Sequence, residues 1–323
     1  MEGKFKLIAG NANKSLALEV AKHLNVKLTP VDIHKFNDGE IYVRILESVR
    51  GCNVFIIQPT SPDANLHLME LLIMVDALKR ASPKRITAVM PYFGYSRQDR
   101  KTKPREPITA KLVAKLLEAA GVDRVMTFEL HVPQVQGFFD IPSDNLDLIP
   151  LHAENILNKK LKDIVIVAPD VGSAARARSL ARVIHAPIAI VDKRRPEQGI
   201  AKVEHIMGDV KNKTAILVDD IIDTAGTITE SVSMLKKYGA KDIYVLATHP
   251  VLSWPAIKRL QKSPIQEIFV TNTIELPKEK QIKKIKIISI APLLSETIKR
   301  AHEGTPMGIV YEKLYEKLKK RNK

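Results

Sequence analysis

The sequence predicts an α/β protein of two domains, each a mostly parallel β-sheet flanked by helices. Short apolar runs alternate with segments of helical periodicity along almost the whole chain,. Several runs consist mainly of Val, Ile, Leu and Ala, as expected for strands that are buried on both faces. The length of 323 residues suits two domains of ordinary size,.

The expected strands and helices alternate in order. In the first half we expect strands at residues 5–9, 41–46, 53–58, 85–90 and 124–129, and helices at 15–24, 64–80 and 109–120. In the second half we expect strands at 163–168, 188–191, 214–218, 242–248, 267–270 and 286–290, and helices at 173–184, 227–238 and 293–302. Gly121, Gly239 and Gly304 follow helices, where a left-handed residue is favoured,. Strand–helix alternation implies parallel sheets.

The domain boundary is expected in the segment 142–150, which contains two prolines and several acids and has no periodicity,. The expected division is therefore a first domain at 1–146, a second at 147–304 and a basic tail at 305–323. Residues 193–202, KRRPEQGIAK, interrupt the second domain and predict a mobile loop between two strands.

Composition excludes several classes of protein. The 51 basic and 36 acidic residues give a net charge of +15, and one cysteine, Cys52, excludes an internal disulfide,. No apolar run is long enough for a membrane span, and the N-terminus shows no signal peptide, so we expect a cytoplasmic protein. Much of the excess charge lies in residues 278–286 and 313–323. A solvated basic face with a frayed terminus explains it better than a nucleic-acid or membrane surface, because no aromatics interleave with the charges.

The strongest candidate site is the segment 215–227, AILVDDIIDTAGT. It predicts a buried strand ending in Asp219 and Asp220, then a small polar turn and a helix. Ligands of open α/β sheets bind beyond the carboxyl ends of the strands. The N–H groups of residues 224–227 can converge on an anion, and the acids suit sugar hydroxyls or magnesium through water. The segment therefore predicts a sugar-phosphate site, although a strand end with ordinary helix capping is the alternative.

This segment resembles the phosphoribosyl-pyrophosphate motif of the phosphoribosyltransferase-type fold. The resemblance implies two similar domains of that type. It also implies that ribose 5-phosphate is bound by Asp219, Asp220, Asp223, Thr224, Ala225, Gly226 and Thr227. It does not distinguish enzymes that consume phosphoribosyl pyrophosphate from those that make it.

Further motifs narrow the resemblance. They are FNDGE at 36–40, RQDRK at 97–101, FELH at 128–131, KRR at 193–195 and THPVLS at 248–253. In this order they resemble the ribose-phosphate pyrophosphokinase family over residues 6–302. The resemblance implies transfer of the β,γ-diphosphoryl group of ATP to the 1-hydroxyl of ribose 5-phosphate, with Mg²⁺ as cofactor and AMP as the second product. The chain has no GxxxxGK[ST] or GxGxxG loop, so side chains and metal must neutralise the ATP phosphates,.

The resemblance assigns roles residue by residue. It places ATP, with the regulatory contacts, on the first domain, and ribose 5-phosphate, with the catalytic loop, on the second. ATP is assigned to Phe36, Asn37, Asp38, Gly39, Glu40, Arg97 and Gln98, and the metal to His131 and Asp170. Lys193 and Arg195 match the catalytic loop, where cations stabilise the charge of the transferred group; Arg195 also binds ribose 5-phosphate. The resemblance suggests no general base.

The sequence departs from the family pattern at several positions. Glu129 stands for an aspartate, Asn37 for serine or alanine, Ser173 and Pro250 for glycine, and Trp254 for a small residue. Ser173 is expected to restrict the backbone near the sugar, and Trp254 is either core or interface. Ser48, Arg50 and Ser82 match a regulatory phosphate site, but residues 303–308 lack its usual serines, so weakened regulation is expected.

Two other functions are compatible with the segment 215–227. A phosphoribosyltransferase would need neither Arg97 and Gln98 nor a doubled α/β layout. A non-catalytic subunit that regulates a synthetase would be expected to have lost Lys193, Arg195, His131 or Asp170, all of which are present.

The family resemblance implies a homo-oligomer, a hexamer built from dimers, with the adenine loop shared between subunits. ATP and ribose 5-phosphate are the expected ligands, with no nucleic acid and no membrane.

Overall fold

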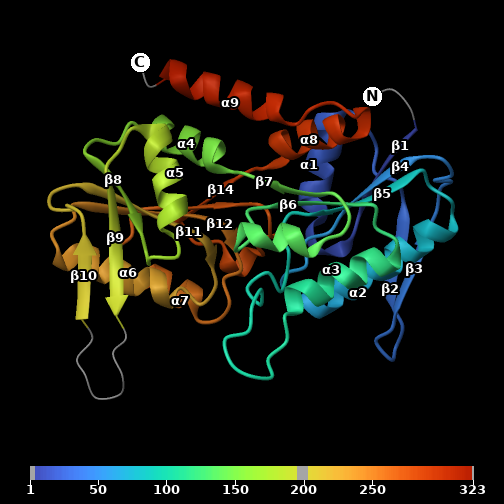
Figure 1. The fold of residues 1–323 in the computed structure, drawn as a ribbon, viewed down its shortest axis with the longest axis horizontal. Coiled ribbons are helices and arrows are strands. Elements are labelled where there is room, and N and C mark those ends of the chain that lie inside the picture. The colour runs from blue at the N-terminus through green and yellow to red at the C-terminus, as the bar shows by residue number, and fades with distance from the viewer. Residues whose placement is uncertain (1–3, 195–202, 322–323) are drawn as a thin grey trace. The chain divides into compact units, whose positions relative to one another are not determined.

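The computed structural model describes residues 4–194 and 203–321, which form two compact units. The first unit contains the described residues up to Asp147, with Thr273–Glu275 and Ser289–Val310; the second contains the remainder. The division after Asp147 lies within the expected linker. Residues 289–304, which were expected in the second domain, group with the first unit instead. Each unit has the predicted α/β architecture (Figure 1).

The first unit is built on a five-stranded parallel sheet of order β1-β4-β5-β6-β7. Its strands are β1 (Phe5–Ala9), β4 (Asn53–Ile57), β5 (Arg85–Met90), β6 (Arg124–Phe128) and β7 (Ser143–Leu146). Helices α2 (Ala64–Arg80) and α3 (Thr109–Ala120) cover one face, and α1 (Lys14–Leu24) and α8 (Ala291–Glu303) cover the other (Figure 1). A separate antiparallel hairpin consists of β2 (Val31–Lys35) and β3 (Ile41–Ile45).

Helix α8 groups with the first unit because it packs on α1. The Ser295 hydroxyl lies 3.4 Å from the Val20 carbonyl oxygen, and the Ser289 hydroxyl donates to Glu19 at 2.6 Å. Leu294 and Ile298 of α8 are completely buried. An amphipathic helix gains most of its stability from burying such a face, so its partner, and not its place in the sequence, decides where it belongs.

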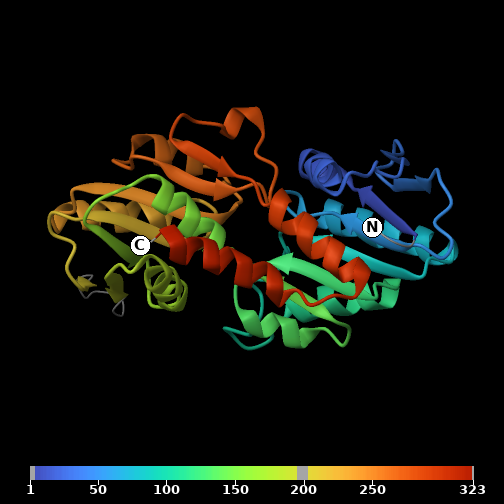
Figure 2. The same ribbon diagram turned by 90° about the horizontal axis from the view of Figure 1, so that it is seen from above.

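The second unit is built on a seven-stranded sheet of order β10-β9-β8-β11-β12-β13-β14. Its strands are β8 (Ile164–Ala168), β9 (Ile188–Arg194), β10 (Val203–Met207), β11 (Thr214–Ile222), β12 (Asp242–Pro250), β13 (Ile268–Thr271) and β14 (Ile285–Ile288). Strand β10 pairs antiparallel with β9, and the other pairings are parallel. Helices α4 (Ile149–Asn158) and α5 (Ala174–Ile184) cover one face, and α6 (Gly226–Lys237) and α7 (Ala256–Lys262) the other (Figures 1 and 2).

The basic tail is helix α9 (Gly308–Arg321), not a frayed terminus. From Tyr311 on it groups with the second unit, where Leu318 is buried in the core beside α4 and α5. Lys317 and Arg321 both pair with Glu154. Part of the positive charge is therefore neutralised within the fold.

Several elements were not predicted, for identifiable reasons. Strand β7 is a short polar edge strand whose Asp144 accepts two hydrogen bonds from Arg124. Helix α4 begins at Ile149 with a proline in its first turn, within the segment read as linker,. Helix α7 is too short to show a clear period, and β2 and β10 are partly exposed or edge strands. Three-dimensional packing stabilised elements that carry weak local signals.

None of the helices formed by the described residues is both long and apolar enough to cross a membrane. Cys52 is buried, with a free thiol.

Candidate functional site

The acids of the predicted motif lie where the second unit's sheet changes its winding direction. From β8 the chain crosses through α5 to β9 on one side, and from β11 it crosses through α6 to β12 on the other. Ligands of open α/β sheets bind at such a switch point, beyond the carboxyl ends of the strands. Strand β8 ends just before Asp170, and its pairing with β11 ends at Leu217, two residues before Asp219. The strand order of the first unit's described sheet runs in one direction and has no such point.

Ser173 joins the acids of these two strands. Its hydroxyl lies 3.1 Å from Asp170 Oδ1 and 3.1 Å from Asp219 Oδ1, and its N–H donates to Asp170 Oδ1 at 2.9 Å. Ser173 takes ordinary helical angles (φ −82°, ψ −2°), so a side chain fits at this position without backbone strain. The serine acts as a bridge between two carboxyl groups.

The acid cluster changes the protonation of Asp219. Burial raises the pKa of Asp219 to about 7, and the charges of Asp220 and Asp170 act in the same direction,. A hydroxyl has one hydrogen, so Ser173 can bond both acids at once only if one of them is protonated, which agrees with this pKa. The cluster is therefore poised to receive a cation or sugar hydroxyl groups.

A cation that the sequence analysis missed lies beside these acids. Burial lowers the pKa of the Arg176 guanidinium, while the charges of Asp220 and Asp219 act in the opposite direction. Arg176 belongs to the first turn of α5, three residues after Ser173. That spacing places it on the helix face of Ser173 and could have pointed to it.

The turn at 224–227 leads from β11 into α6. Ala225 is the N-cap residue, in the left-handed region (φ +60°, ψ 15°), and it has no side chain that could cap the helix. No acid occurs in the first turn of α6. Ala225 is buried, whereas Thr224 and Thr227 are exposed. A helix N-terminus of this kind attracts anions through its N–H groups and dipole.

A buried histidine supports the next strand of the site. His152 of α4 lies with Nε2 3.1 Å from the Thr248 hydroxyl of β12, and both residues are buried. The following residue, His249, pairs in register with Ile221 of β11. Burial, together with the charge of His249, lowers the pKa of His152 to about 3. His152 therefore stays neutral at physiological pH.

Acid should destabilise the protein through His152. Between pH 6.5 and about 3 the unfolded chain binds a proton at this residue and the folded protein does not. The free energy of unfolding should therefore fall by about 1.4 kcal/mol per pH unit, or about 2 kcal/mol from pH 6.5 to pH 5. Urea unfolding at pH 7.5 and pH 5 measures this loss. It should shrink by a similar amount in His152→Leu and stay unchanged in His23→Leu, whose histidine is exposed. An equal loss in wild type and His152→Leu would contradict the assignment.

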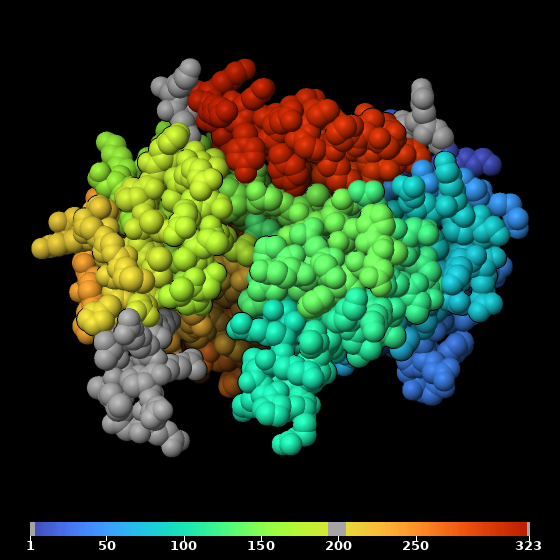
Figure 3. All heavy atoms as spheres, in the orientation of Figure 1, coloured from blue at the N-terminus to red at the C-terminus, as the bar shows by residue number. Residues whose placement is uncertain are grey.

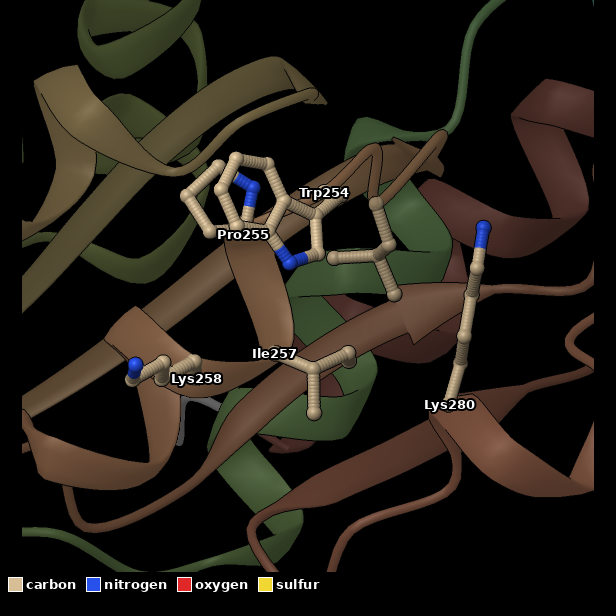
Figure 4. A pocket seen from close by; sticks show the side chains of 6 residues that line it. Trp254, Pro255, Ile257, Lys258 and Lys280 are labelled. Atoms are coloured by element: carbon tan, nitrogen blue, oxygen red, sulfur yellow. The ribbon is translucent and has the colours of Figure 1, made fainter.

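A small pocket lies elsewhere in the second unit, at the start of α7 (Figure 4). It has a volume of about 200 Å³ and is lined by Leu252, Trp254, Pro255, Ile257, Lys258 and Lys280. Ligand pockets usually measure about 300–1,000 Å³, so the acid cluster remains the stronger candidate site. Trp254 is 88% exposed, which excludes the core alternative for this residue.

The first unit presents the predicted adenine loop at the tip of the β2–β3 hairpin. Phe36 is 50% exposed, and its ring contacts the rings of His34 and Tyr42 edge-on. The N–H of Phe36 donates to the Glu40 carbonyl, and Gly39 takes a positive φ of +93° that favours glycine,. The tip thus holds an exposed aromatic surface next to two acids.

Arg97 and Gln98 lie in the long loop between β5 and α3, residues 91–108, which projects from the first unit (Figure 3). Both residues are exposed. Gln98 Oε1 accepts a hydrogen bond from the Thr109 hydroxyl at 2.6 Å, which ties the loop to the start of α3. Gly94 allows the tight bend, since a Cβ there would lie 2.5 Å from the Thr60 carbonyl oxygen.

His131 and Asp170, the predicted metal residues, belong to different units. His131 is exposed after β6, and the preceding Glu129 is buried with a positive φ of +36°. Within residues 4–194 and 203–321, no three His, Cys, Asp or Glu side chains are grouped closely enough to hold a metal by themselves. An ion at the acid cluster would therefore keep water or substrate oxygens among its ligands, as Mg²⁺ commonly does.

The structure describes only one of the two proposed catalytic-loop residues. The backbone of Lys193 lies in β9, paired with Glu204 of β10, whereas Arg195 lies outside the described residues.

The regulatory candidates Ser48, Arg50 and Ser82 are all exposed on the first unit. A backbone bond from Gly51 to the Ser82 carbonyl brings their two loops together.

Comparison with known proteins shows what the chain resembles. Residues 5–121 match the family model of the N-terminal domain of ribose phosphate pyrophosphokinase, and residues 193–312 match that of the phosphoribosyl synthetase-associated domain. A ribose-phosphate pyrophosphokinase of Caldanaerobacter subterraneus subsp. tengcongensis is 56% identical over 307 residues, covering 95% of this chain and 97% of the relative. That of Bacillus subtilis is 55% identical over 306 residues, covering 95% and 96%.

A solved structure agrees with these relatives. The crystal structure of phosphoribosylpyrophosphate synthetase from Mycobacterium smegmatis is 44% identical in sequence and superposes with a TM-score of 0.89. It covers 94% of this chain and 100% of that one. This chain therefore resembles these synthetases both in sequence and in fold, over nearly its whole length.

Proposed function

The chain belongs to the family of ribose-phosphate pyrophosphokinases, and on this premise we propose that it transfers the β,γ-diphosphoryl group of ATP to the 1-hydroxyl of ribose 5-phosphate. The products are phosphoribosyl pyrophosphate and AMP. The acid cluster beside the α6 N-terminus, at the switch point of the second sheet, is the observation that carries the proposal. The carboxylates accept hydrogen bonds from sugar hydroxyls, and the N–H groups of the turn donate to a phosphate. A sugar phosphate carries both of these groups, so the site matches it in hydrogen-bonding character.

In this proposal ribose 5-phosphate lies across β11 and the start of α6. Asp219 and Asp220 accept hydrogen bonds from the ribose hydroxyls, and residues 223–227 hold the 5-phosphate. Arg176 balances the negative charge of the acids when the site is empty. Because the acids are partly buried, their hydrogen bonds to the sugar are stronger than they would be in water.

ATP is assigned to the first unit. The exposed ring of Phe36 offers a stacking surface for adenine, with Asn37, Asp38, Gly39 and Glu40 completing the loop,. Arg97 presents an exposed guanidinium for the phosphates, and Gln98 is held in place by Thr109,.

Mg²⁺ is the proposed cofactor because the available donors are hard carboxylate oxygens, those of Asp170, Asp219 and Asp220,. Asp170 would hold it at the acid cluster, and His131 is the other residue that the family resemblance assigns to the metal. Bound Mg²⁺ would neutralise charge on the ATP phosphates. The protein's own contribution is to keep Asp170 oriented through the Ser173 N–H and hydroxyl.

Lys193 and Arg195 are the proposed catalytic residues. The transferred group spreads negative charge over its oxygens in the transition state, and two positioned cations stabilise that charge. Positioning and charge neutralisation suffice for phosphoryl transfer, so no general base is assigned.

Assembly and location follow from the family. We propose a cytoplasmic homo-oligomer, a hexamer built from three dimers, in which the Phe36 loop serves a neighbouring subunit. Sedimentation equilibrium in assay buffer measures its mass, and a fully active monomer would refute the shared site.

Regulation by phosphate at Ser48, Arg50 and Ser82 should be weak. Proline has no N–H, and the Pro306 carbonyl and the Thr305 N–H are both taken by Arg300, so this segment offers few donors for an anion,. We expect ADP inhibition to change less than about threefold when inorganic phosphate is raised from 1 to about 30 mM, a span of roughly 2 kcal/mol in chemical potential. Inhibition that phosphate strongly relieves would contradict this.

The decisive experiment mixes the purified protein with ATP, ribose 5-phosphate and Mg²⁺ and follows AMP by chromatography. We expect AMP in step with phosphoribosyl pyrophosphate, and none when EDTA replaces Mg²⁺. Formation of ADP would mean single-phosphoryl transfer and would refute the mechanism. Absence of turnover with both ligands bound would favour the regulatory-subunit alternative.

A further inference from the structure

Arg259 connects helix α7 to the turn that precedes α6. Its Nη1 donates to the Thr224 carbonyl oxygen at 3.0 Å. The same nitrogen lies 3.4 Å from the position that a Cβ on Gly226 would occupy. The guanidinium therefore lies against the turn assigned to the 5-phosphate, although Arg259 stands 35 residues after Thr224 in the sequence.

This bond orients a backbone donor. The Thr224 carbonyl and the Ala225 N–H belong to one peptide unit, and in a trans peptide these groups point in opposite directions. The cis bond in the described chain is Trp254–Pro255, so the peptide at 224–225 is trans. By holding the carbonyl on its own side, Arg259 directs the Ala225 N–H to the opposite side of the turn.

The turn needs such support because Ala225 is in the left-handed region, with φ +60°. For a residue other than glycine this conformation costs about 1 kcal/mol or more. The Thr229 hydroxyl donates to the Ala225 carbonyl at 2.8 Å, lies 3.1 Å from the Gly226 carbonyl oxygen, and so fixes the helix side of the turn. Arg259 fixes the strand side.

We propose that Arg259 is a positioning residue for the phosphate of the sugar phosphate. It holds the turn in the form that presents its N–H groups to a phosphate monoester dianion, and it adds a positive charge on the carbonyl side of the same turn. This inference rests on the proposed function, which assigns the turn to the 5-phosphate. It extends the site to α7, a helix that the sequence motif does not include. Gly226 has no side chain that could press on the guanidinium.

The test compares Arg259→Met with Arg259→Lys and with the control Lys258→Met. Lys258 is the exposed neighbour on α7, so the control removes the same charge one residue away. For Arg259→Met we expect the KM for ribose 5-phosphate to rise about tenfold or more, since a charge-assisted bond and a charge are lost. The KM for ATP and kcat should stay within about twofold of wild type. Arg259→Lys should recover part of the loss, and Lys258→Met should match wild type.

A structural role of Arg259 predicts a different pattern. It would lower kcat, raise both KM values and lower the melting temperature together, and that result would overturn the proposal. An unchanged KM for ribose 5-phosphate in Arg259→Met would overturn it as well.

Calorimetric titration with ribose 5-phosphate separates this inference from the proposed reaction. If wild type makes no AMP but binds ribose 5-phosphate, and Arg259→Met binds it about tenfold more weakly, then the reaction fails and the role of Arg259 stands. If wild type does not bind ribose 5-phosphate, both fail.

Discussion

Replacing Lys193 with alanine should lower kcat by about 10²–10³-fold. Removing one preorganised donor from a charged transition state typically costs that much. Because the contact forms only as the group is transferred, kcat and kcat/KM should fall by similar factors, while the KM values change little. Initial rates of AMP formation over a grid of both substrates measure this.

The matched control is Lys237→Ala. Lys237 is exposed near the C-terminal end of α6, at the opposite end of that helix from the proposed phosphate site, and its loss changes net charge equally. It should keep wild-type kinetics. A loss below about tenfold for Lys193→Ala would exclude a main electrostatic role for this residue.

Replacing Asp219 with asparagine should stabilise the protein above pH 7 and weaken sugar binding. The pKa of Asp219 is raised to about 7 in the folded state from an ordinary value of 3.8, first by burial and then by Asp220 and Asp170. The folded state therefore holds a proton between these values that the unfolded chain has lost. The stabilising contribution is fully present below pH 3.8 and is lost as pH rises through about 7,.

Asparagine cannot ionise, so Asp219→Asn avoids that loss. Relative to wild type, its free energy of unfolding should gain about 2–4 kcal/mol between pH 4 and pH 8. Urea unfolding at both pH values measures the gain, and Glu279→Gln, which neutralises an exposed acid of the same unit, should show none. A pH-independent difference between Asp219→Asn and wild type would show that Asp219 is not the group that holds the proton.

The same variant should lose activity. An amide replaces a charged acceptor for the ribose hydroxyls, and hydrogen bonds to charged groups are worth about 1.5–3 kcal/mol. We therefore expect kcat/KM for ribose 5-phosphate to fall by about 10–100-fold, with the KM for ATP nearly unchanged. Higher stability with lower activity would mark Asp219 as a residue kept for binding at a cost to the fold.

The sequence predicted the fold class and most of the strands of the two main sheets. Strands such as β5 and helices such as α2 and α3 begin and end where the pattern places them, because long apolar periodicity survives any packing arrangement. It did not predict β7, α4 or α7, whose local signals are weak. It also placed α8 with the second half of the chain, although α8 packs on α1.

For the candidate site, the sequence by itself determined the chemistry of the segment 215–227, because strand, acids, turn and helix are contiguous there. Only the tertiary structure brought Ser173 between Asp170 and Asp219, Arg176 beside the acids, and Arg259 onto the Thr224 carbonyl. The contact between Ser173 and Asp219 joins residues 46 positions apart, and the bond from Arg259 to Thr224 joins residues 35 positions apart. Side-chain contacts across a sheet depend on strand order and register, which no local pattern encodes. The raised pKa of Asp219 has the same origin, since burial and neighbouring charges exist only in the folded chain.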